Sequence, residues 1–128
     1  MAKIISISLS EDLLEELERL QKEMGFSGKS ETIRAGIRML VSDDKERAKL
    51  TGVVDAVLLA IHKDEYVKDI SELAHMHAPI IKTQIHHHLE NEKCLEIYVL
   101  NGQAEKIRAA ARAFQKNKKI DLSKLIPT

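Results

Sequence analysis

The feature that most constrains this chain is a histidine-rich segment that ends at its only cysteine. Five of the six histidines and Cys94 fall between positions 75 and 94, in the sequence HMHAPIIKTQIHHHLENEKC. The alternating pattern from Ile80 to Glu90 predicts a β-strand, on which side chains two residues apart share a face. His86 and His88 therefore lie on one face of this strand, and His87 lies on the other.

A polar segment, residues 90–93, follows the histidine strand and favours a hairpin turn. Cys94 opens the next apolar run, and an antiparallel return brings its sulfur beside His86 and His88. Two imidazoles and one thiolate suit nickel, copper, zinc or cobalt, whereas calcium and magnesium prefer oxygen ligands. His75, at the end of a predicted helix, is available as a fourth ligand from the same chain or from a partner subunit. A planar set would favour nickel(II) or copper(II), and a tetrahedral set would favour zinc.

The first 50 residues predict one short strand and two helices. Apolar and polar residues alternate over positions 3–9, which predicts the strand. Ser10 is a good N-cap for the first helix, Gly25 is expected to end that helix, and Ser30 is predicted to cap the second helix. About 45 residues of this kind bury little core alone, and a single strand has nothing to pair with. Both problems disappear if two chains pair their strands over four helices. We interpret the charged stretch 42–49 as the frayed end of the second helix and a linker, although a solvated helical face fits it nearly as well.

The rest of the chain predicts the order β-α-β-β-α-β, which is a ferredoxin-like fold. The expected elements are a strand from Val53 to Ile61, a helix over about 65–76, the histidine strand, the Cys94 strand closed by Asn101-Gly102, a helix over 103–115 and a strand over 120–126. We therefore predict an α+β chain with one domain over residues 1–48 and another over residues 49–128.

The spacing of His75, His86-x-His88 and Cys94, followed by Leu-Glu-Ile, resembles the metal site of the NikR family of nickel-responsive transcription regulators. The segment 25–38, GFSGKSETIRAGIR, resembles the turn and second helix of the family. The resemblance implies a ribbon-helix-helix domain for DNA binding and dimerisation over residues 1–48, and an ACT-like domain for metal binding and tetramerisation over residues 49–128. It implies one nickel(II) per chain, held by His86, His88 and Cys94 of one subunit and His75 of another.

The same resemblance implies a cytoplasmic homotetramer, a dimer of dimers, that binds a DNA operator and represses nickel uptake when it holds nickel. The outward ribbon residues Ser6 and Ser8 would enter the major groove, with the adjacent Lys3 as a substitute for the Arg expected near Ile4. Lys29 and Ser30 would hold a phosphate at the start of the second helix. Glu96 either holds a ligand histidine through its second ring nitrogen or lies solvated on its strand.

Some residues depart from the family pattern. Residues 1–50 hold nine Lys and Arg against ten Asp and Glu, Ile4 stands where an Arg is expected, and Ala35 replaces an Asp that helps to hold a cation between the domains. These departures motivate an alternative, a metal-binding or storage module whose ribbon only dimerises. His62 is not assigned a role, because Ala60 replaces the Tyr expected two residues before it and the spacing from His62 to His75 is one residue shorter than in the family. His77 is expected at the surface. His87 is expected either in a structural role or as a support for the metal ligands.

Other classes of protein receive little support. No nucleotide-binding fingerprint or paired acid and base is readable, so a metalloenzyme is disfavoured. No apolar run is long enough to span a bilayer, and we expect no membrane partner. A single cysteine cannot form an internal disulfide, which fits a reducing cytoplasm.

Overall fold

The computed structural model describes residues 2–128, and the chain divides into two compact units, Met1–Ala48 and Lys49–Thr128. All strands that the structure assigns within residues 2–128 belong to the second unit. None of the helices in this part of the chain is both long enough and apolar enough to cross a bilayer.

The first unit starts with a segment, residues 2–10, that has no regular secondary structure. The sequence predicts a strand here, but a strand needs a neighbour to satisfy its backbone groups, and a single chain offers none. Ile5 and Ile7 are consequently 79% and 56% exposed instead of half-buried. The predicted strand is therefore absent from the single chain, and its apolar face remains uncovered.

Helix α1, Glu11–Met24, begins and ends where the sequence predicts. The Ser10 hydroxyl accepts the Leu13 N–H at 3.2 Å, and the acidic residues of the first turn face the positive end of the helix dipole. Gly25 ends the helix in the left-handed conformation, with φ of 73°, which a residue without Cβ adopts at little cost.

Helix α2, Lys29–Ala48, differs from the prediction at both ends. It begins before Ser30, because the Gly28 carbonyl already accepts the Thr32 N–H at 3.1 Å and the Thr32 hydroxyl at 2.9 Å. The prediction of Ser30 as the N-cap is therefore wrong, and Ser30 lies inside the first turn. Residues 42–48 are helical throughout, so the charged stretch is a solvated helical face and not a frayed end with a linker.

The apolar sides of α1 and α2 lie largely uncovered in one chain. Among residues 2–48, only Thr32 is buried. Leu13, Met24, Ile37 and Leu40 are each more than half exposed. Such an apolar surface on a small unit indicates a surface that associates, since apolar area is stabilised by removal from water.

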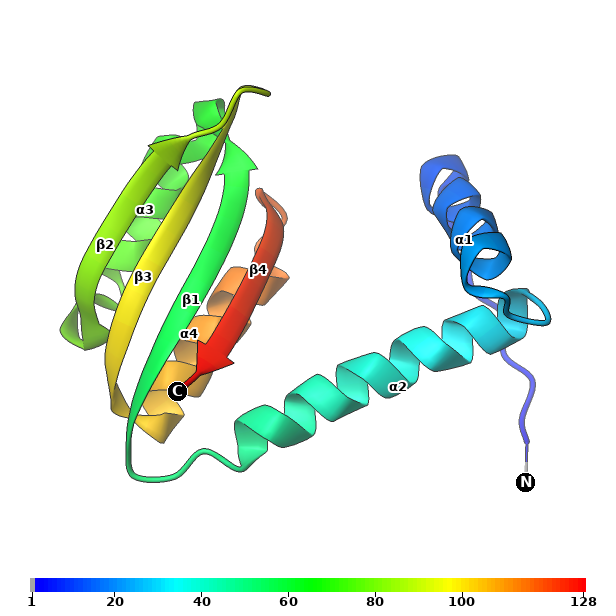
Figure 1. Cartoon of the computed structure of the whole chain (residues 1–128), viewed down its shortest axis with the longest axis horizontal. Coiled ribbons are helices and arrows are strands. Elements are labelled where there is room, and N and C mark those ends of the chain that lie inside the picture. The colour runs from blue at the N-terminus through cyan, green and yellow to red at the C-terminus, as the bar shows by residue number, and fades with distance from the viewer. Residues whose placement is uncertain (1) are drawn as a thin grey trace. The chain divides into compact units, whose positions relative to one another are not determined.

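The second unit has the order β1-α3-β2-β3-α4-β4, with two short 3₁₀ turns, η1 and η2, on either side of α3 (Figure 1). The four strands form one antiparallel sheet in the spatial order β2-β3-β1-β4. This arrangement confirms the predicted ferredoxin-like fold. The elements are β1 Val53–Lys63, η1 Asp64–Tyr66, α3 Val67–His75, η2 Ala78–Ile80, β2 Ile81–His88, β3 Lys93–Gln103, α4 Ala104–Lys116 and β4 Ile120–Pro127.

Strand β3 runs past the Asn101-Gly102 pair that the sequence predicts as its end. Pairing with β1 continues to the partners Val53 and Gln103, so backbone hydrogen bonding carries the strand through Gly102. A Cβ at Gly102 would lie 2.6 Å from Ile80 Cγ2. The glycine therefore serves the close approach of η2 to the sheet and not a turn.

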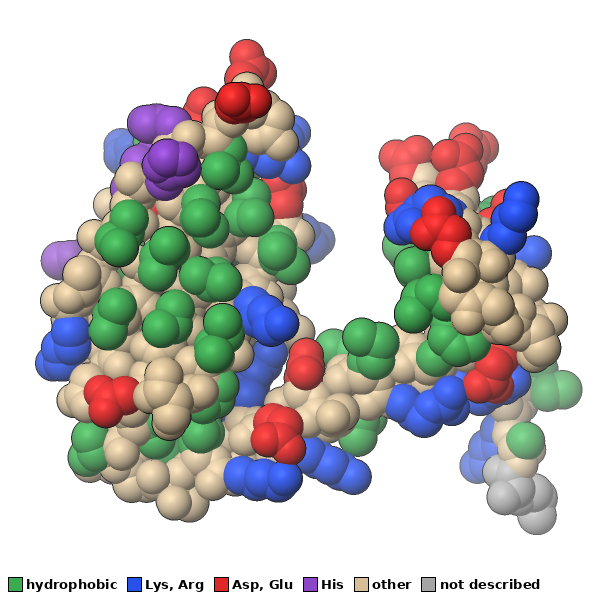
Figure 2. Space-filling model, in the orientation of Figure 1, with side chains coloured by type: hydrophobic (Ala, Val, Ile, Leu, Met, Phe, Trp, Pro, Cys, Tyr) green, Lys and Arg blue, Asp and Glu red, His purple; other side chains and the backbone are tan. Residues whose placement is uncertain are grey.

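Both helices of this unit cover the same face of the sheet (Figure 1). Ile70 and Ala74 of α3 and Ile107 and Phe114 of α4 are buried against strand residues such as Tyr98. No helix of this unit covers the other face, over which hydrophobic side chains gather (Figure 2). Exposed members of this open face are Ile85, Val99, Leu122 and Ile126.

Candidate metal centre

The β2–β3 hairpin sets the geometry of the candidate centre. Its turn is closed by the Leu89 N–H, which donates to the Lys93 carbonyl at 2.7 Å, and contains Glu92 in the left-handed region at φ of 59°. In the resulting register His88 lies opposite Cys94 and His86 lies opposite Glu96. The structure thus has the hairpin that the sequence predicts. The side chains of His86, His88, Cys94 and Glu96 lie on the face of the sheet that the helices cover.

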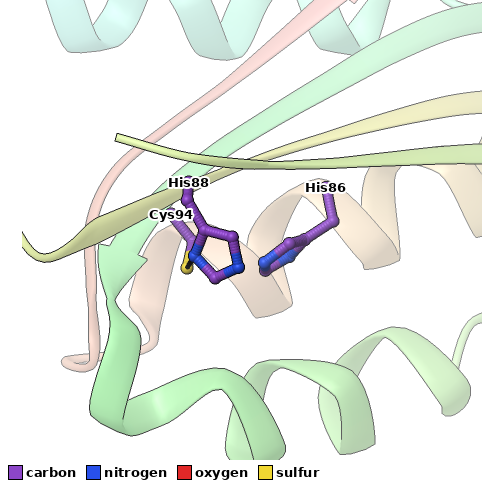
Figure 3. Close-up of side chains that lie close together, drawn as sticks. All are labelled: His86, His88 and Cys94. Atoms are coloured by element: carbon purple, nitrogen blue, oxygen red, sulfur yellow. Dashed lines mark hydrogen bonds between the residues drawn. The ribbon is translucent and has the colours of Figure 1, made fainter. Parts of the chain in front are cut away.

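His86, His88 and Cys94 come together at the end of the hairpin (Figure 3). One potential ligand atom from each lies within 4.8 Å of the others, and the Cys94 sulfur is 3.6 Å from His88 Nδ1. The two rings are nearly perpendicular, with centroids 4.8 Å apart. Both histidines are exposed, whereas Cys94 is only 1% exposed. A metal ion can therefore enter from the histidine side and reach a sulfur that lies at the floor of the site.

Glu96 orients one of these rings. Its carboxylate is 2% exposed, and its Oε1 accepts a hydrogen bond from His86 Nδ1–H, while Oε2 accepts the Gln84 amide at 3.2 Å. With Nδ1 protonated, Nε2 carries the lone pair that can bind a metal. Of the two alternatives for Glu96, the solvated one is thus wrong, since the carboxylate is buried and hydrogen-bonded to a histidine.

His62 lies behind the same carboxylate, although the sequence assigned it no role. It is fully buried, its Nδ1 is 2.7 Å from the Lys63 carbonyl oxygen, and its Nε2 is 3.4 Å from Glu96 Oε1. His62 and Cys94 are paired in the β1–β3 register. The β-α-β-β-α-β order of a ferredoxin-like fold indicates that β1 and β3 are neighbours, but it does not give the register that pairs His62 with Cys94.

Asp64 is the second residue that the sequence did not single out. It follows β1 directly, and its Oδ1 accepts the Cys94 S–H at 2.8 Å and lies 3.7 Å from His88 Nδ1. Burial, together with the hydrogen bond to Asp64, raises the pKa of the Cys94 thiol to about 11. The sulfur is therefore protonated near neutral pH until a metal displaces its proton.

The remaining histidines are spread over other surfaces. His75 is exposed at the end of α3 and does not belong to the cluster of His86, His88 and Cys94 in its own chain. His77 lies at the surface but is partly covered, with its ring centroid 6.5 Å from that of Phe114. Burial lowers the pKa of His77. His87 is exposed on the face of the strand opposite His86 and His88.

The residues predicted to contact DNA all lie at the surface of the first unit. Lys3, Ser6 and Ser8 are exposed, as are Lys29 and Ser30. Lys29 Nζ is 3.8 Å from Glu18 Oε1, so an incoming phosphate would compete with that carboxylate.

Glu31, about one helical turn before Ala35, is paired within its own helix. Its carboxylate accepts hydrogen bonds from Arg34 at 3.1 Å and Arg38 at 2.9 Å. Both guanidinium groups hold the pKa of Glu31 below its usual value. A cation at this position would have to displace two arginines.

The donor set fits a borderline transition metal. Imidazole nitrogen and thiolate sulfur suit nickel, copper, zinc and cobalt. A buried carboxylate that holds one ligand ring is the usual support of such sites.

Comparison with known proteins gives two matches along the chain. Residues 54–128 match the NikR C-terminal nickel binding domain, and residues 3–43 match the ribbon-helix-helix proteins of the copG family. The chain is 32% identical over 129 residues to a protein of Methanocaldococcus jannaschii, covering 96% of this chain and 92% of the relative. It is 31% identical over 127 residues to a protein of Methanosarcina mazei, covering 97% and 87%. Their names are "Putative nickel-responsive regulator" and "Putative nickel-responsive regulator 1".

A solved structure shares the fold of part of this chain. An uncharacterized protein of Thermotoga maritima aligns with a TM-score of 0.54 at 16% identity, covering 59% of this chain and 98% of that one. Together with the two sequence matches, this likeness confirms the predicted fold class, a ribbon-helix-helix unit followed by a ferredoxin-like unit.

Proposed function

Because the chain belongs to the NikR family, we propose that it is a nickel-responsive DNA-binding regulator and not an enzyme. The observation that carries the proposal is the cluster of His86, His88 and Cys94 in a chain that begins with a ribbon-helix-helix unit. A site for a borderline transition metal and a DNA-binding unit in one chain imply that the metal controls DNA binding.

His86, His88 and Cys94 would hold one nickel(II) per chain, with His75 of the partner subunit as the fourth ligand. His75 is exposed and stands apart from the cluster of its own chain, which suits a donor to another subunit. When bound, nickel(II) supplies a link between subunits. Cys94 releases its proton on ligation, and Glu96 keeps Nε2 of His86 free for the metal.

Two uncovered apolar surfaces support a homotetramer, a dimer of dimers. The face of α1 and α2 would close a ribbon-helix-helix dimer, in which residues 3–9 of two chains pair as strands. The open sheet face with Ile85 and Val99 would join the second units. Bound nickel would then favour the arrangement in which both ribbons meet one operator in the cytoplasm, and linkage requires that DNA tighten nickel binding by the same factor. Repression of nickel uptake is the response we propose.

A second candidate function rests on the composition of the first unit. With nine basic against ten acidic residues in positions 1–50, counterion release on DNA would be modest. Ile4, fully exposed, offers a base no hydrogen bond. In this alternative the chain binds or stores metal, and its ribbon only dimerises.

Nickel titration followed by binding to the DNA upstream of the chain's own gene tests the proposal. We expect one nickel per chain, thiolate-to-nickel absorption, and DNA binding only with nickel. His88→Ala should abolish nickel-dependent DNA binding, whereas His87→Ala, whose side chain lies on the opposite face, should retain it. Nickel binding without any DNA binding would favour the storage alternative, and unchanged nickel affinity in His88→Ala would contradict the metal site.

A further inference from the structure

The Asp64 carboxylate stands in the candidate metal centre as close to its neighbours as a ligand would. Its Oδ1 is 2.8 Å from the Cys94 sulfur and 3.7 Å from His88 Nδ1, and that sulfur and nitrogen are 3.6 Å apart. Metal–ligand bonds of about 2.0–2.3 Å at tetrahedral angles separate neighbouring ligand atoms by roughly 3.3–3.6 Å. Two of the three separations thus match a shared ion closely, and the third, between sulfur and oxygen, is the length of the hydrogen bond that an ion would replace.

The backbone holds Asp64 at this place. It is the first residue after β1, and its N–H donates to the Glu92 carbonyl in the β2–β3 turn at 3.0 Å. The side chain is 47% exposed, so the carboxylate can turn toward an ion without breaking a core contact. The chain therefore places a carboxylate beside His88 and Cys94, two members of the cluster that they form with His86.

We propose that Asp64 is a fourth metal ligand within the chain and that it serves tetrahedral ions such as zinc(II) and cobalt(II). Zinc accepts carboxylate oxygen together with sulfur and nitrogen as ligands, and it has no electronic preference for a planar coordination geometry. Planar nickel(II), in contrast, is better served by a third imidazole, His75 of the partner subunit. The inference rests on the proposed function for the positions of the other three ligands.

This assignment gives the site a means of distinguishing metals. An ion closed by Asp64 has all its ligands in one chain and makes no link between subunits. An ion that takes His75 of the partner subunit joins two chains. Zinc would therefore occupy the site without producing the assembled, DNA-binding arrangement that nickel produces.

Four variants of the full-length chain separate the two ligand sets: Asp64→Asn, Asp64→Glu, His75→Ala and Asp69→Asn. Asp69 lies on α3 and pairs with Lys119, so it is a control for loss of one carboxylate. Each variant would be titrated with cobalt(II), zinc(II) and nickel(II), with visible spectra, chelator competition and thermal melting as readouts.

We expect Asp64→Asn to lose the tetrahedral cobalt bands and to bind zinc more than 100-fold more weakly, beyond the roughly 10–100-fold cost of losing an outer-sphere partner. Its nickel–thiolate absorption should be unchanged. Asp64→Glu should keep the cobalt bands, His75→Ala should lose the planar nickel spectrum but keep zinc and cobalt, and Asp69→Asn should behave as wild type.

Cobalt bands at wild-type positions in Asp64→Asn, with zinc affinity within about tenfold, would overturn the proposal and leave Asp64 as a hydrogen-bond acceptor of the thiol. Loss of zinc in His75→Ala would also overturn it, because the site would then depend on two chains for every metal. Absence of thiolate-to-metal absorption from the wild-type chain would instead overturn the metal centre itself, and this proposal with it.

Discussion

Replacement of Glu96 tests how the fold prepares His86 for a metal. The buried carboxylate accepts the His86 Nδ1–H and the Gln84 amide and has His62 Nε2 3.4 Å away. Glu96→Gln keeps the shape but replaces a charged acceptor by a neutral one and points an N–H₂ group at one of its neighbours. Glu96→Ala removes the acceptor, so His86 is free to rotate and to bind through the wrong nitrogen.

The expected loss follows from this contact. Removing a carboxylate that holds a ligand histidine costs about 10–100-fold in metal affinity, or roughly 1.4–2.8 kcal/mol. Because the amide oxygen introduced by Glu96→Gln can still accept from His86, this variant should lie near the tenfold end. Glu96→Ala should approach a hundredfold loss, since nothing then fixes the ring.

Competition of nickel between each variant and a chelator of known affinity measures the effect. Glu72→Gln is the control, because Glu72 is an exposed carboxylate on α3. Melting curves of the metal-free variants would show whether they fold. If folded Glu96→Ala bound nickel as tightly as wild type, the carboxylate would not orient His86 and the reasoning would fail.

Two further predictions concern pH and assembly. Because the Cys94 thiol has a pKa raised to about 11 and binds metal only as thiolate, nickel affinity should rise about tenfold per pH unit and keep rising past pH 9, where an ordinary thiol levels off. The affinity for nickel therefore falls as the pH falls, and Cys94→Ala should remove this dependence on pH. A nickel affinity that stops rising below pH 9 in the wild type would contradict the raised pKa. Val99→Lys, on the open sheet face, should weaken association measured by sedimentation of the metal-free chain, whereas Gln115→Lys, at an exposed position on α4, should not. Equal behaviour of the two variants would exclude the open face as the interface.

The parts of the centre that sequence reasoning found are local in the chain. His86, His88 and Cys94 belong to one hairpin, and a short turn fixes which residues face each other. Asp64 and His62 reach the centre through the β1–β3 pairing, across about thirty residues, and a strand pattern alone does not give the register of such a pair. The element order predicted that β1 and β3 are neighbours, but not that His62 would pair with Cys94.

The fold was predictable for a similar reason. Periodicity and caps indicated α1 and the order of the second unit, because each element carries its own pattern. The start of α2 was missed since a backbone carbonyl, Gly28, begins the helix ahead of the better capping residue Ser30. The end of β3 was missed because pairing with β1 overrides the Asn-Gly signal at Gly102.

The thiol at the floor of the centre also determines how the metal-free protein withstands oxidants. Peroxides and disulfides react with thiolate, and a thiol with a pKa of about 11 is ionised in only about one molecule in ten thousand at pH 7. Cys94 is also 1% exposed, so an oxidant would have to approach the sulfur from the exposed histidines, as a metal ion does. Metal-free Cys94 should therefore react with oxidants more slowly than an ordinary thiol, and the sulfur loses its proton when an ion binds it.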